Sequence, residues 1–488
     1  MSLRSRLARL SSAPFPEEIR VDPPPAATGD RAALLDDLRE RIRATLERSA
    51  RRAVVSPPPV DTVDLPFVTT DTPLGPLHVR ATRLSPAHRT GRAQIYPARS
   101  ADTEVLSLLA LDPRVARCNP ARALYLDTET TGLSGGTGTI AFLVGLAWWE
   151  RTPESGRPQP QALVLEQILV RNLGEEAPML ERVRERIEDA ELLVTFNGKS
   201  FDLPLLRTRF VMARAAAPAE PPHLDLLHVA RRVHKQRAHG QGCRLVALER
   251  EVLGFERSDD VESRDVSACY LHFLRTGDAR GLLAVVEHNA WDVVAMAALV
   301  GLYGAPLHEG LAAEDLVGVA RTMRRAGSLD RAREVADVAV ERQTSPESLR
   351  ARADIAKALG ERDRALADFE AIARLADDPA ARLELAKIYE HSFKSPAKAL
   401  AWAGRGTGEA PVSAQRRLAR LARKVAKAEA TLSREPPSRQ AAKRARAGES
   451  TSARERRSGA RRRGEGVAQD LQGILDVALR DDQRRRDP

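Results

Sequence analysis

Three strand-like apolar runs follow one another between residues 123 and 170, and a fourth comes after a helical stretch. The first three are ALYLD, TIAFLVGLAWW and ALVLEQILV, separated by turns rich in Gly, Ser and Pro. Three such runs in quick succession predict an antiparallel meander. A helical pattern at 175–187 leads to the fourth run, ELLVTF at 191–196, and nearly all of the chain beyond residue 226 has a helical pattern, including 281–302. This order predicts an α/β or α+β fold with a mainly helical second half.

Two acids stand at the end of the first strand, in the segment LYLDTETTGL. Asp127 and Glu129 are two positions apart, so their side chains lie on one face of the strand. Two carboxylates side by side repel each other unless a cation neutralises them, and a divalent metal is the natural cation. Thr130 and Gly132 follow, where hydroxyl and backbone donors suit a phosphate or a sugar. Taken alone, this short pattern also occurs in many surface turns.

Two further motifs bring polar side chains in a fixed order along the chain. In LLVTFNGKSFDLPLL, a strand delivers Asn197, and Asp202 falls in the first turn of the next helix. The helix dipole alone would also explain an acid at that position. In EHNAWDVVAMAALV, His288 and Asp292 are four residues apart and share a helix face, as polar pairs on ordinary helices also do. The combination and the order of the three motifs indicate one acidic site.

A repeat of 33 to 34 residues occupies the region from Glu314 to Gly406. The segment GSLDRA at 327–332 recurs as GERDRA at 360–365, and PAKA follows at 396–399. This period predicts tetratricopeptide-like helix pairs that stack on one another. Because there are only about three units and few of the motif's Trp and Tyr landmarks, an ordinary helical bundle stays open as the alternative.

The net charge of +10 is unevenly distributed along the chain. Residues 439–463 hold ten Lys or Arg against Glu449 and Glu455, a net +8 in one low-complexity run. A polyanionic partner would explain such an excess. The run is interpreted either as a solvated linker or as a tail that grips nucleic acid.

These patterns divide the chain into four parts. Residues 1–60 are expected to form a mostly disordered segment with one helix near 30–46, and 61–305 contain the acidic motifs. Tetratricopeptide-like helices are expected at 311–430. A disordered, basic low-complexity tail with a short terminal helix is expected at 431–488.

The cysteines and the apolar runs indicate the compartment. Cys118, Cys243 and Cys269 are widely spaced and odd in number, which argues against a disulfide framework and for a reducing environment. The first residues, MSLRSRLARL, interrupt every short apolar run with arginine, and the longest apolar stretch, 140–149, is too short to span a bilayer. We therefore expect a cytoplasmic protein without a membrane segment.

At its acidic motifs the chain resembles the DEDD exonuclease superfamily on the RNase-H-like fold. This resemblance implies an α/β fold with a mixed sheet flanked by helices. The resemblance extends to the YprB-like branch, predicted bacterial exonucleases with DTETTGL-x-GGTGT, FNGKSFDLPLL and EHN-x-x-D, where this chain has DTETTGLSGGTGT, FNGKSFDLPLL and EHNAWD. CRLVALEREVLGFER at 243–257 and TPLGPLHVR at 72–80 also resemble that branch. The resemblance covers 72–302 and leaves the helical repeats and the basic tail outside.

The resemblance implies two Mg²⁺ or Mn²⁺ ions held by the family's four acids, which are here Asp127, Glu129, Asp202 and Asp292. Asp127 would bridge both ions, Glu129 and Asp292 would complete the ion on the nucleophile side, and Asp202 would hold the other through water. His288 would orient or deprotonate the attacking water. In the family, a His precedes the last Asp by five residues or a Tyr precedes it by four, whereas here a His occupies the tyrosine position.

We therefore expect a 3′–5′ exonuclease on single-stranded or frayed DNA or RNA, with the repeats recruiting a protein partner. The alternatives are an endonuclease on the same fold and a non-catalytic nucleic-acid-binding scaffold that acts through its repeats. All four acids are present together with a histidine, which favours the enzyme. Arg231 and Arg232 are expected to contact phosphate beside the site, although a solvated helix face is the simpler explanation. For Trp291, core packing is preferred over stacking on a base.

Overall fold

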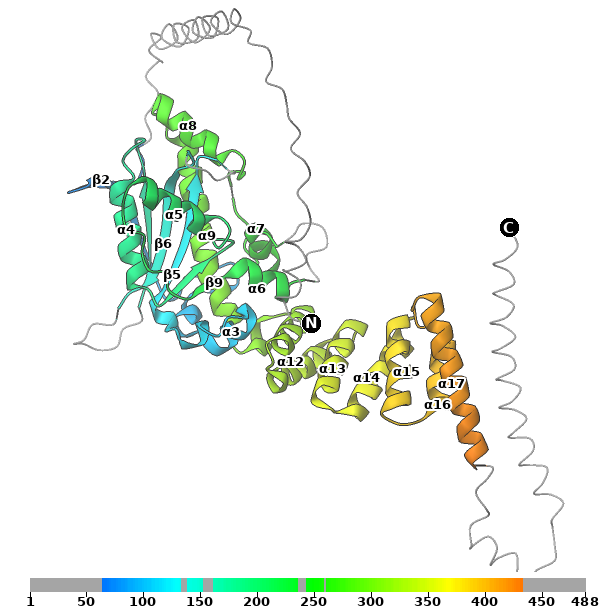
Figure 1. The fold of residues 1–488 in the computed structure, drawn as a ribbon. Helices are drawn as coiled ribbons and strands as arrows, with labels where there is room; N and C mark the ends of the chain where they lie inside the picture. Colours follow the sequence, from blue (N-terminus) through cyan, green and yellow to red (C-terminus); the bar gives the residue numbers. More distant parts are fainter. Residues whose placement is uncertain (1–63, 133–137, 152–160, 236–242, 259, 433–488) are drawn as a thin grey trace, which may run out of the picture. The chain divides into compact units, whose positions relative to one another are not determined.

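The structure is a computed structural model of the full chain. It describes residues 64–132, 138–151, 161–235, 243–258 and 260–432, as Figure 1 shows. All of them belong to one compact unit that begins at Val63. The expected N-terminal helix, the basic run and the terminal helix lie outside the described residues. These expectations and the domain boundaries remain predictions.

A seven-stranded mixed sheet forms the centre of the sheet region (Figure 1). Its spatial order is β1-β2-β7-β6-β5-β8-β9, and its strands are β1 (Val68–Thr72), β2 (Gly75–Leu84), β5 (Ala123–Thr130), β6 (Ala141–Trp149), β7 (Leu163–Leu169), β8 (Leu192–Thr195) and β9 (His223–Asp225). Strands β5, β6 and β7 pair antiparallel, which confirms the predicted meander. Strand β8 lies parallel to β5 and β9 lies parallel to β8, because helices cross over between them. A separate ribbon pairs β3 (Arg89–Thr90) with β4 (Ala93–Gln94).

Helices and short helical turns connect these strands. The turns and the helix before β5 are η1 (Tyr96–Ser100), α3 (Thr103–Ala110), η2 (Val115–Arg117) and η3 (Pro120–Arg122). The later elements are α4 (Ala177–Asp189), α5 (Asp202–Met212), α6 (Leu226–Val233), α7 (Leu245–Leu248), the π-helical turn η4 (Glu249–Leu253), α8 (Val266–Thr276), α9 (Arg280–Tyr303) and α10 (Leu307–Gly310). The helices predicted at 175–187 and 281–302 are α4 and α9.

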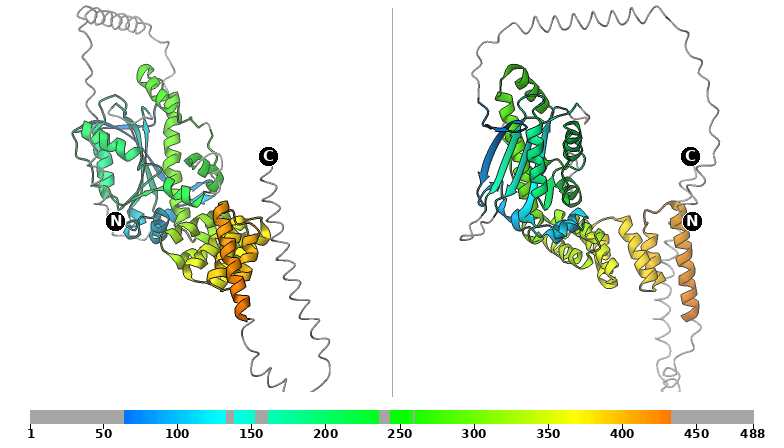
Figure 2. Two further views of the ribbon diagram at one scale, coloured as in Figure 1. Left: turned by 45° about the vertical axis from the view of Figure 1, so that its right-hand side comes forward. Right: turned by 60° about the vertical axis from the view of Figure 1, so that its left-hand side comes forward.

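Helices cover both faces of the sheet (Figure 2). On one face, α4 and α5 share a core cluster with Leu124 and Leu126 of β5. On the other face, α9 shares a core cluster with Tyr125. Successive strand residues point to opposite faces, so the part of β5 that lies between the two helical layers is apolar at every position. Polar side chains from both layers can therefore converge only where β5 leaves the core.

Helix α9 is long and apolar enough to cross a membrane by length and composition. Within this fold, 72% of its most apolar 18-residue window is buried against other elements. Its apolar side chains belong to the core clusters that also contain β5, β6 and β7. Burial inside the fold accounts for the apolar composition of α9.

Strand β6 carries one extra residue beside the end of β5. Its pairing with β5 skips Phe142, which lies between the partners of Glu129 and Thr130. This β-bulge lets the neighbouring residues Phe142 and Leu143 both face the core cluster under α8 and α9. Phe142 stacks on Tyr270 of α8, with the ring centroids 4.0 Å apart. The bulge thus ties α8 to the strand that ends at the acidic motif.

A series of paired helices follows the sheet region. They are α11 (Ala313–Arg325), α12 (Leu329–Arg342), α13 (Pro346–Leu359), α14 (Arg362–Leu375), α15 (Pro379–His391) and α16 (Pro396–Gly404), and α17 (Pro411–Leu432) comes after them. Helices α11, α13 and α15 begin at residues 313, 346 and 379, each 33 residues after the one before. Gly327 and Gly360, between the helices of two pairs, have φ values of 86° and 80°, where glycine is favoured. The tetratricopeptide-like type of these pairs remains a prediction.

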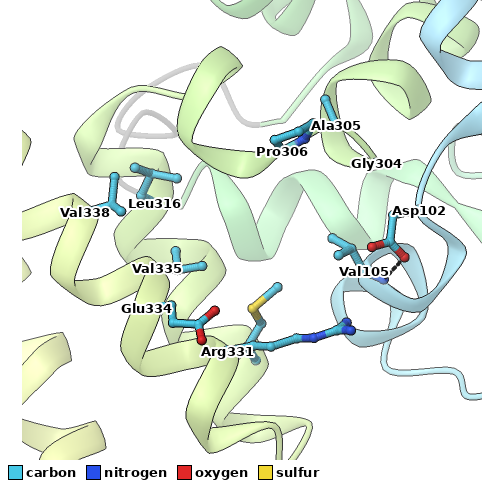
Figure 3. A pocket seen from close by; sticks show the side chains of 11 residues that line it. Asp102, Val105, Gly304, Ala305, Pro306, Leu316, Arg331, Glu334, Val335 and Val338 are labelled. Atoms are coloured by element: carbon cyan, nitrogen blue, oxygen red, sulfur yellow. Dashed lines mark hydrogen bonds between the residues drawn. The ribbon is translucent and has the colours of Figure 1, made fainter.

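The first helix pair packs against the sheet region through α11. His234, which ends α6, is buried with its ring nitrogens 2.9 Å from Asp315 Oδ1 of α11 and 2.9 Å from Tyr303 Oη of α9. A cavity of about 390 Å³ lies between α3, α11 and α12 (Figure 3). Its lining is mostly apolar, and Arg331 extends across it toward α3, where it pairs with Glu104 at 2.6 Å. The lining of this cavity includes no acid of the three motifs.

Candidate active site

The first two acids lie at the end of β5 on the side that α9 covers. Asp127 and Glu129 are both half-buried. Asn289 of α9 donates a hydrogen bond from Nδ2 to Asp127 Oδ2 at 2.8 Å. Thr128 points to the opposite side and donates from Oγ1 to Asp202 Oδ1 at 2.6 Å. Alternate residues of β5 thus contact both helical layers. Asp127 bonds to the Asn289 amide of α9, and Thr128 bonds to the Asp202 carboxylate of α5.

Buried amides hold Asp127 in one orientation. Asn289 Oδ1 accepts a hydrogen bond from Gln167 Nε2 at 3.0 Å, and the same Nε2 donates to the Val286 carbonyl at 2.7 Å. Asn289 and Gln167 are both fully buried. Gly145, the β6 partner of Asp127, has no side chain, and this lets Asn289 lie against the sheet. A network whose members are all bonded restricts the Asp127 carboxylate.

Asp202 is the first residue of α5 and is buried. Burial disfavours its charged form and raises its pKa to about 6, even though hydrogen bonds from Thr128 and from backbone N–H groups favour the carboxylate. The sequence prediction of an acid in the first turn of this helix is confirmed. Without a cation, Asp202 takes up a proton more readily than an exposed aspartate.

Asp225 anchors the loop that leads to Asp202, a role that the sequence did not reveal. Its carboxylate accepts hydrogen bonds from the backbone N–H groups of Asn197, Lys199 and Leu227 at 2.8, 3.1 and 3.1 Å. Asn197 has a φ of 71°, a left-handed conformation that asparagine tolerates better than most residues. Asp225 stands at the end of the three-residue strand β9, which gave no signal in the sequence.

Helix α9 brings His288 and Asp292 to the same end of β5. His288 Nε2 lies 3.6 Å from Asp292 Oδ2, and His288 Nδ1 lies 2.6 Å from Asp260 Oδ1. One ligand atom each from Glu129, His288 and Asp292 lie within 4.8 Å of one another, close enough to share a metal ion. The histidine at the unusual spacing therefore faces the acids.

A buried arginine lies behind His288 and Asp292. Arg257 donates from Nε and Nη2 to the two carboxylate oxygens of Glu249 at 2.6 and 2.7 Å, and Nη2 also donates to Asp292 Oδ1. Its Nη1 lies 3.3 Å from Asp260 Oδ2 and 3.1 Å from His288 Nδ1. Burial alone would lower the pKa of Arg257, but its bonds to Glu249 and the charge of Asp292 outweigh burial and raise it. The guanidinium therefore stays charged and fixes Asp292.

The acids crowd one another. Burial raises the pKa of Asp127 well above its ordinary value, and the charges of Asp292 and Asp202 add to this effect. Burial and the neighbouring Asp127 charge likewise raise the pKa of Glu129. Carboxylate oxygens with one imidazole form a donor set that suits Mg²⁺ or Mn²⁺, ions that would also relieve the repulsion. The residues present therefore fit a divalent cation.

These side chains line one cleft of about 450 Å³. Eight of the residues predicted from the sequence lie on its walls, namely Asp127, Glu129, Thr130, Gly132, Asn197, Asp202, His288 and Asp292. Ser267 of α8 closes one side by donating a hydrogen bond to the Thr130 carbonyl at 2.9 Å. Phe201 also lines the cleft and is 57% exposed, so an apolar ring stands beside the acids.

Three residues from the sequence analysis lie elsewhere. Arg231 and Arg232, near the end of α6, do not line the cleft, and Arg232 donates to the Leu109 carbonyl of α3 at 2.8 Å. Trp291 packs edge-on against Phe255, with ring centroids 6.3 Å apart, in agreement with a packing role. The expected phosphate contacts of the two arginines remain untested predictions.

Two comparisons with known proteins agree with this geometry. Residues 124–303 match the family described as the RNase_H superfamily. The chain is also 29% identical over 325 residues to a protein of Bacillus subtilis (strain 168) described as "Uncharacterized protein YprB". That alignment covers 63% of this chain and 76% of the relative. The matched region contains every acid of the cleft.

Proposed function

We propose that this chain, which carries an RNase H superfamily domain, is a metal-dependent nuclease that hydrolyses phosphodiester bonds of DNA or RNA. The observation that supports the proposal is the convergence of Asp127, Glu129, Asp202 and Asp292 with His288 in one cleft. Divalent cations would relieve the repulsion among these crowded acids, and two such ions are the usual agents of phosphodiester hydrolysis. The proposed reaction is 3′–5′ exonucleolytic, on single-stranded or frayed ends.

The proposed ligands are the four acids. Asp127, Glu129, Asp202 and Asp292 would together hold the two Mg²⁺ or Mn²⁺ ions in the cleft. When bound, the ions supply the positive charge that activates water and stabilises the leaving oxygen. The protein supplies the orientation, because Asn289 fixes Asp127, Thr128 fixes Asp202, and Arg257 fixes Asp292.

His288 is the proposed group that orients or deprotonates the attacking water. His288 Nδ1 lies 2.6 Å from the Asp260 carboxylate and 3.1 Å from the donor Nη1 of Arg257. The shorter contact, with the carboxylate, favours a proton on Nδ1 and leaves Nε2 toward the acids. This arrangement resembles a base held by an orienting carboxylate. The four-residue spacing to Asp292 does not prevent the ring from facing Glu129.

The substrate would lie along the open wall of the cleft. Thr130, Gly132 and Asn197 are the proposed contacts for its sugar and phosphate groups, and the exposed ring of Phe201 offers a surface for a base. A terminal nucleotide would fit a volume of about 450 Å³ more readily than a duplex would. This favours a single strand or a frayed end over an intact duplex.

End-labelled DNA and RNA, single-stranded and double-stranded, incubated with the full chain and Mn²⁺ or Mg²⁺ test the proposal. We expect a ladder that shortens from the 3′ end, its loss in EDTA, and its loss in Asp127→Asn. His288→Ala should weaken the activity without abolishing it. Asp71→Asn, an exposed acid of β1, is the matched control and should act like the wild type.

Undiminished cleavage by Asp127→Asn would contradict the proposed chemistry. Binding of nucleic acid without any cleavage would instead favour a non-catalytic scaffold, and internal cuts would favour an endonuclease. We also propose that the paired helices α11 to α16 are tetratricopeptide-like repeats that recruit a protein partner. Their 33-residue period supports this assignment.

A further inference from the structure

A pocket rich in arginine lies at the end of the sheet opposite the acidic cleft. It has a volume of about 310 Å³ and is formed by the start of β5, the end of β6 and the end of α4. Its walls include Ala123, which lies about 13 Å along β5 from Asp127 at the usual rise of a strand. The two sites are therefore separate.

Arg186 of α4 is the central residue of this pocket. Its guanidinium carbon Cζ lies 3.5 Å from the centroid of the Trp148 ring, so the planar group stacks on the indole. Its Nε is buried and has no hydrogen-bond partner among the residues that the structure describes. Burial lowers the pKa of Arg186, which reflects the cost of holding this charge away from water.

The acids around Arg186 are already bound by other arginines. Glu166 accepts two hydrogen bonds from Arg182, at 2.8 and 2.9 Å, and Glu185 pairs with the same arginine at 3.2 Å. Asp189 pairs with the two other arginines of the pocket wall, Arg122 and Arg151. Within the described part of the chain, no carboxylate is paired with Arg186.

We propose that this pocket binds a phosphate group. Its wall carries Arg122, Arg151 and Arg186 with the acid Asp189, and Glu191 beside the wall pairs with Arg122 at 3.1 Å. The three guanidinium groups therefore exceed the two carboxylates by one positive charge, which matches a phosphate mono- or diester. Arginine binds phosphate through two parallel hydrogen bonds, and a guanidinium held flat by an indole is pre-organised for this geometry. The volume exceeds that of a phosphate ion and leaves room for an attached sugar. The phosphate can belong to a nucleic-acid backbone or to a free nucleotide.

Isothermal titration of the full chain in EDTA tests the proposal independently of nuclease activity. Inorganic phosphate, adenosine 5′-monophosphate and a single-stranded octanucleotide are the probes. We expect binding that Arg186→Gln weakens by about tenfold or more, a loss of one strong charged contact. Arg184→Gln is the matched control, because this arginine lies on the same helix and pairs with Glu181 and Glu188 outside the pocket.

Two further variants keep the test decisive if Arg186→Gln is unstable. Arg151→Gln removes a side chain that is 68% exposed and should weaken binding by a few-fold with an unchanged melting curve. Arg186→Lys keeps the charge without the planar stack and should bind between the wild type and Arg186→Gln. Tighter binding of the octanucleotide would identify the ligand as a phosphate of a nucleic-acid backbone. Equally tight binding of adenosine 5′-monophosphate would identify it as the phosphate of a free nucleotide. Equal affinities in Arg186→Gln and Arg184→Gln, or no binding of any probe, would overturn the proposal.

Discussion

Gly145 and Asn289 approach so closely that a Cβ atom on residue 145 would lie 2.3 Å from Asn289 Oδ1. The same atom would lie 2.8 Å from Val293 Cγ2, so neither the amide nor the helix behind it can yield alone. Asn289 is the donor that holds Asp127. The absence of a side chain at residue 145 therefore sets the geometry of an acid on the neighbouring strand.

Gly145→Ala should lower the free energy of unfolding by about 1–3 kcal/mol, the usual cost of overpacking a core. It should also weaken the stabilisation by Mn²⁺, because the displaced Asn289 no longer fixes Asp127. Urea denaturation with and without Mn²⁺ measures both effects. Gly138→Ala, where a Cβ meets nothing within 4 Å, is the control. Equal stability of the two variants would mean that Asn289 is not confined by Gly145.

The pKa of Asp202 predicts how the stability of the metal-free protein depends on pH. Burial raises this pKa from 3.8 to about 6, so the folded state binds the proton more tightly than the unfolded chain does. In EDTA, the free energy of unfolding should therefore fall as the pH rises from about 4 to about 6. Asp202→Asn should remove a part of this fall worth roughly 1–3 kcal/mol.

Urea denaturation in EDTA at intervals across this pH range measures the slope for both proteins. At pH 7 the metal-free Asp202→Asn variant should be the more stable one, since it lacks a buried charge. Identical slopes for the variant and the wild type would show that Asp202 titrates as an ordinary exposed acid.

Asp225→Ala should impair both stability and activity. Loss of the carboxylate leaves three backbone N–H groups without their acceptor, at about 1–3 kcal/mol for each one that stays buried. The loop before α5 then loses its anchor, so kcat of the proposed nuclease should fall more than KM rises. Asp225→Asn keeps an acceptor oxygen, so its stability and its activity should lie between those of the wild type and Asp225→Ala. Full activity of Asp225→Ala would show that Asp202 is positioned without this loop.

Arg257→Met should destabilise the protein by about 3–5 kcal/mol, because it leaves the buried Glu249 unpaired. The double variant Arg257→Met/Glu249→Leu should recover part of this loss, since it removes both buried charges. Thermal and urea unfolding of the single and double variants give the comparison. A double variant less stable than the single one would contradict this account of the network.

The sequence sufficed for the elements whose patterns are local. Strands β5 to β8 were predicted because each is a continuous apolar run between turn residues, and α4 and α9 because their patterns are long. Strand β9 was missed because it has three residues and follows two prolines. Strands β1 and β2 were not predicted, because their residues are largely polar and half-exposed, and the resemblance at 72–80 did not specify a strand.

The acids of the cleft were predicted because each belongs to a short motif. The residues that orient these acids were not predicted, because they act through contacts between distant parts of the sequence. Arg257 meets Asp292 across 35 positions, and Asn289 meets Asp127 across 162. Asn289 stands inside the motif EHNAWD and could have been selected from it. The charge of Arg232 did not indicate where its side chain lies, because hydrogen bonds to the Leu109 and Ala110 carbonyls decide that.

The extra residue in β6 also limits how this strand can change in length. Strand side chains alternate with a period of two, so a deletion beside Phe142 would exchange the faces of every residue on one side of it. Phe142 and Leu143 could then no longer both lie under α8 and α9. In an alignment of relatives that keep the acidic cleft, gaps between the bulge and Gly145 should therefore be rarer than substitutions there. The length of this strand should therefore be conserved more strictly than the identity of its residues.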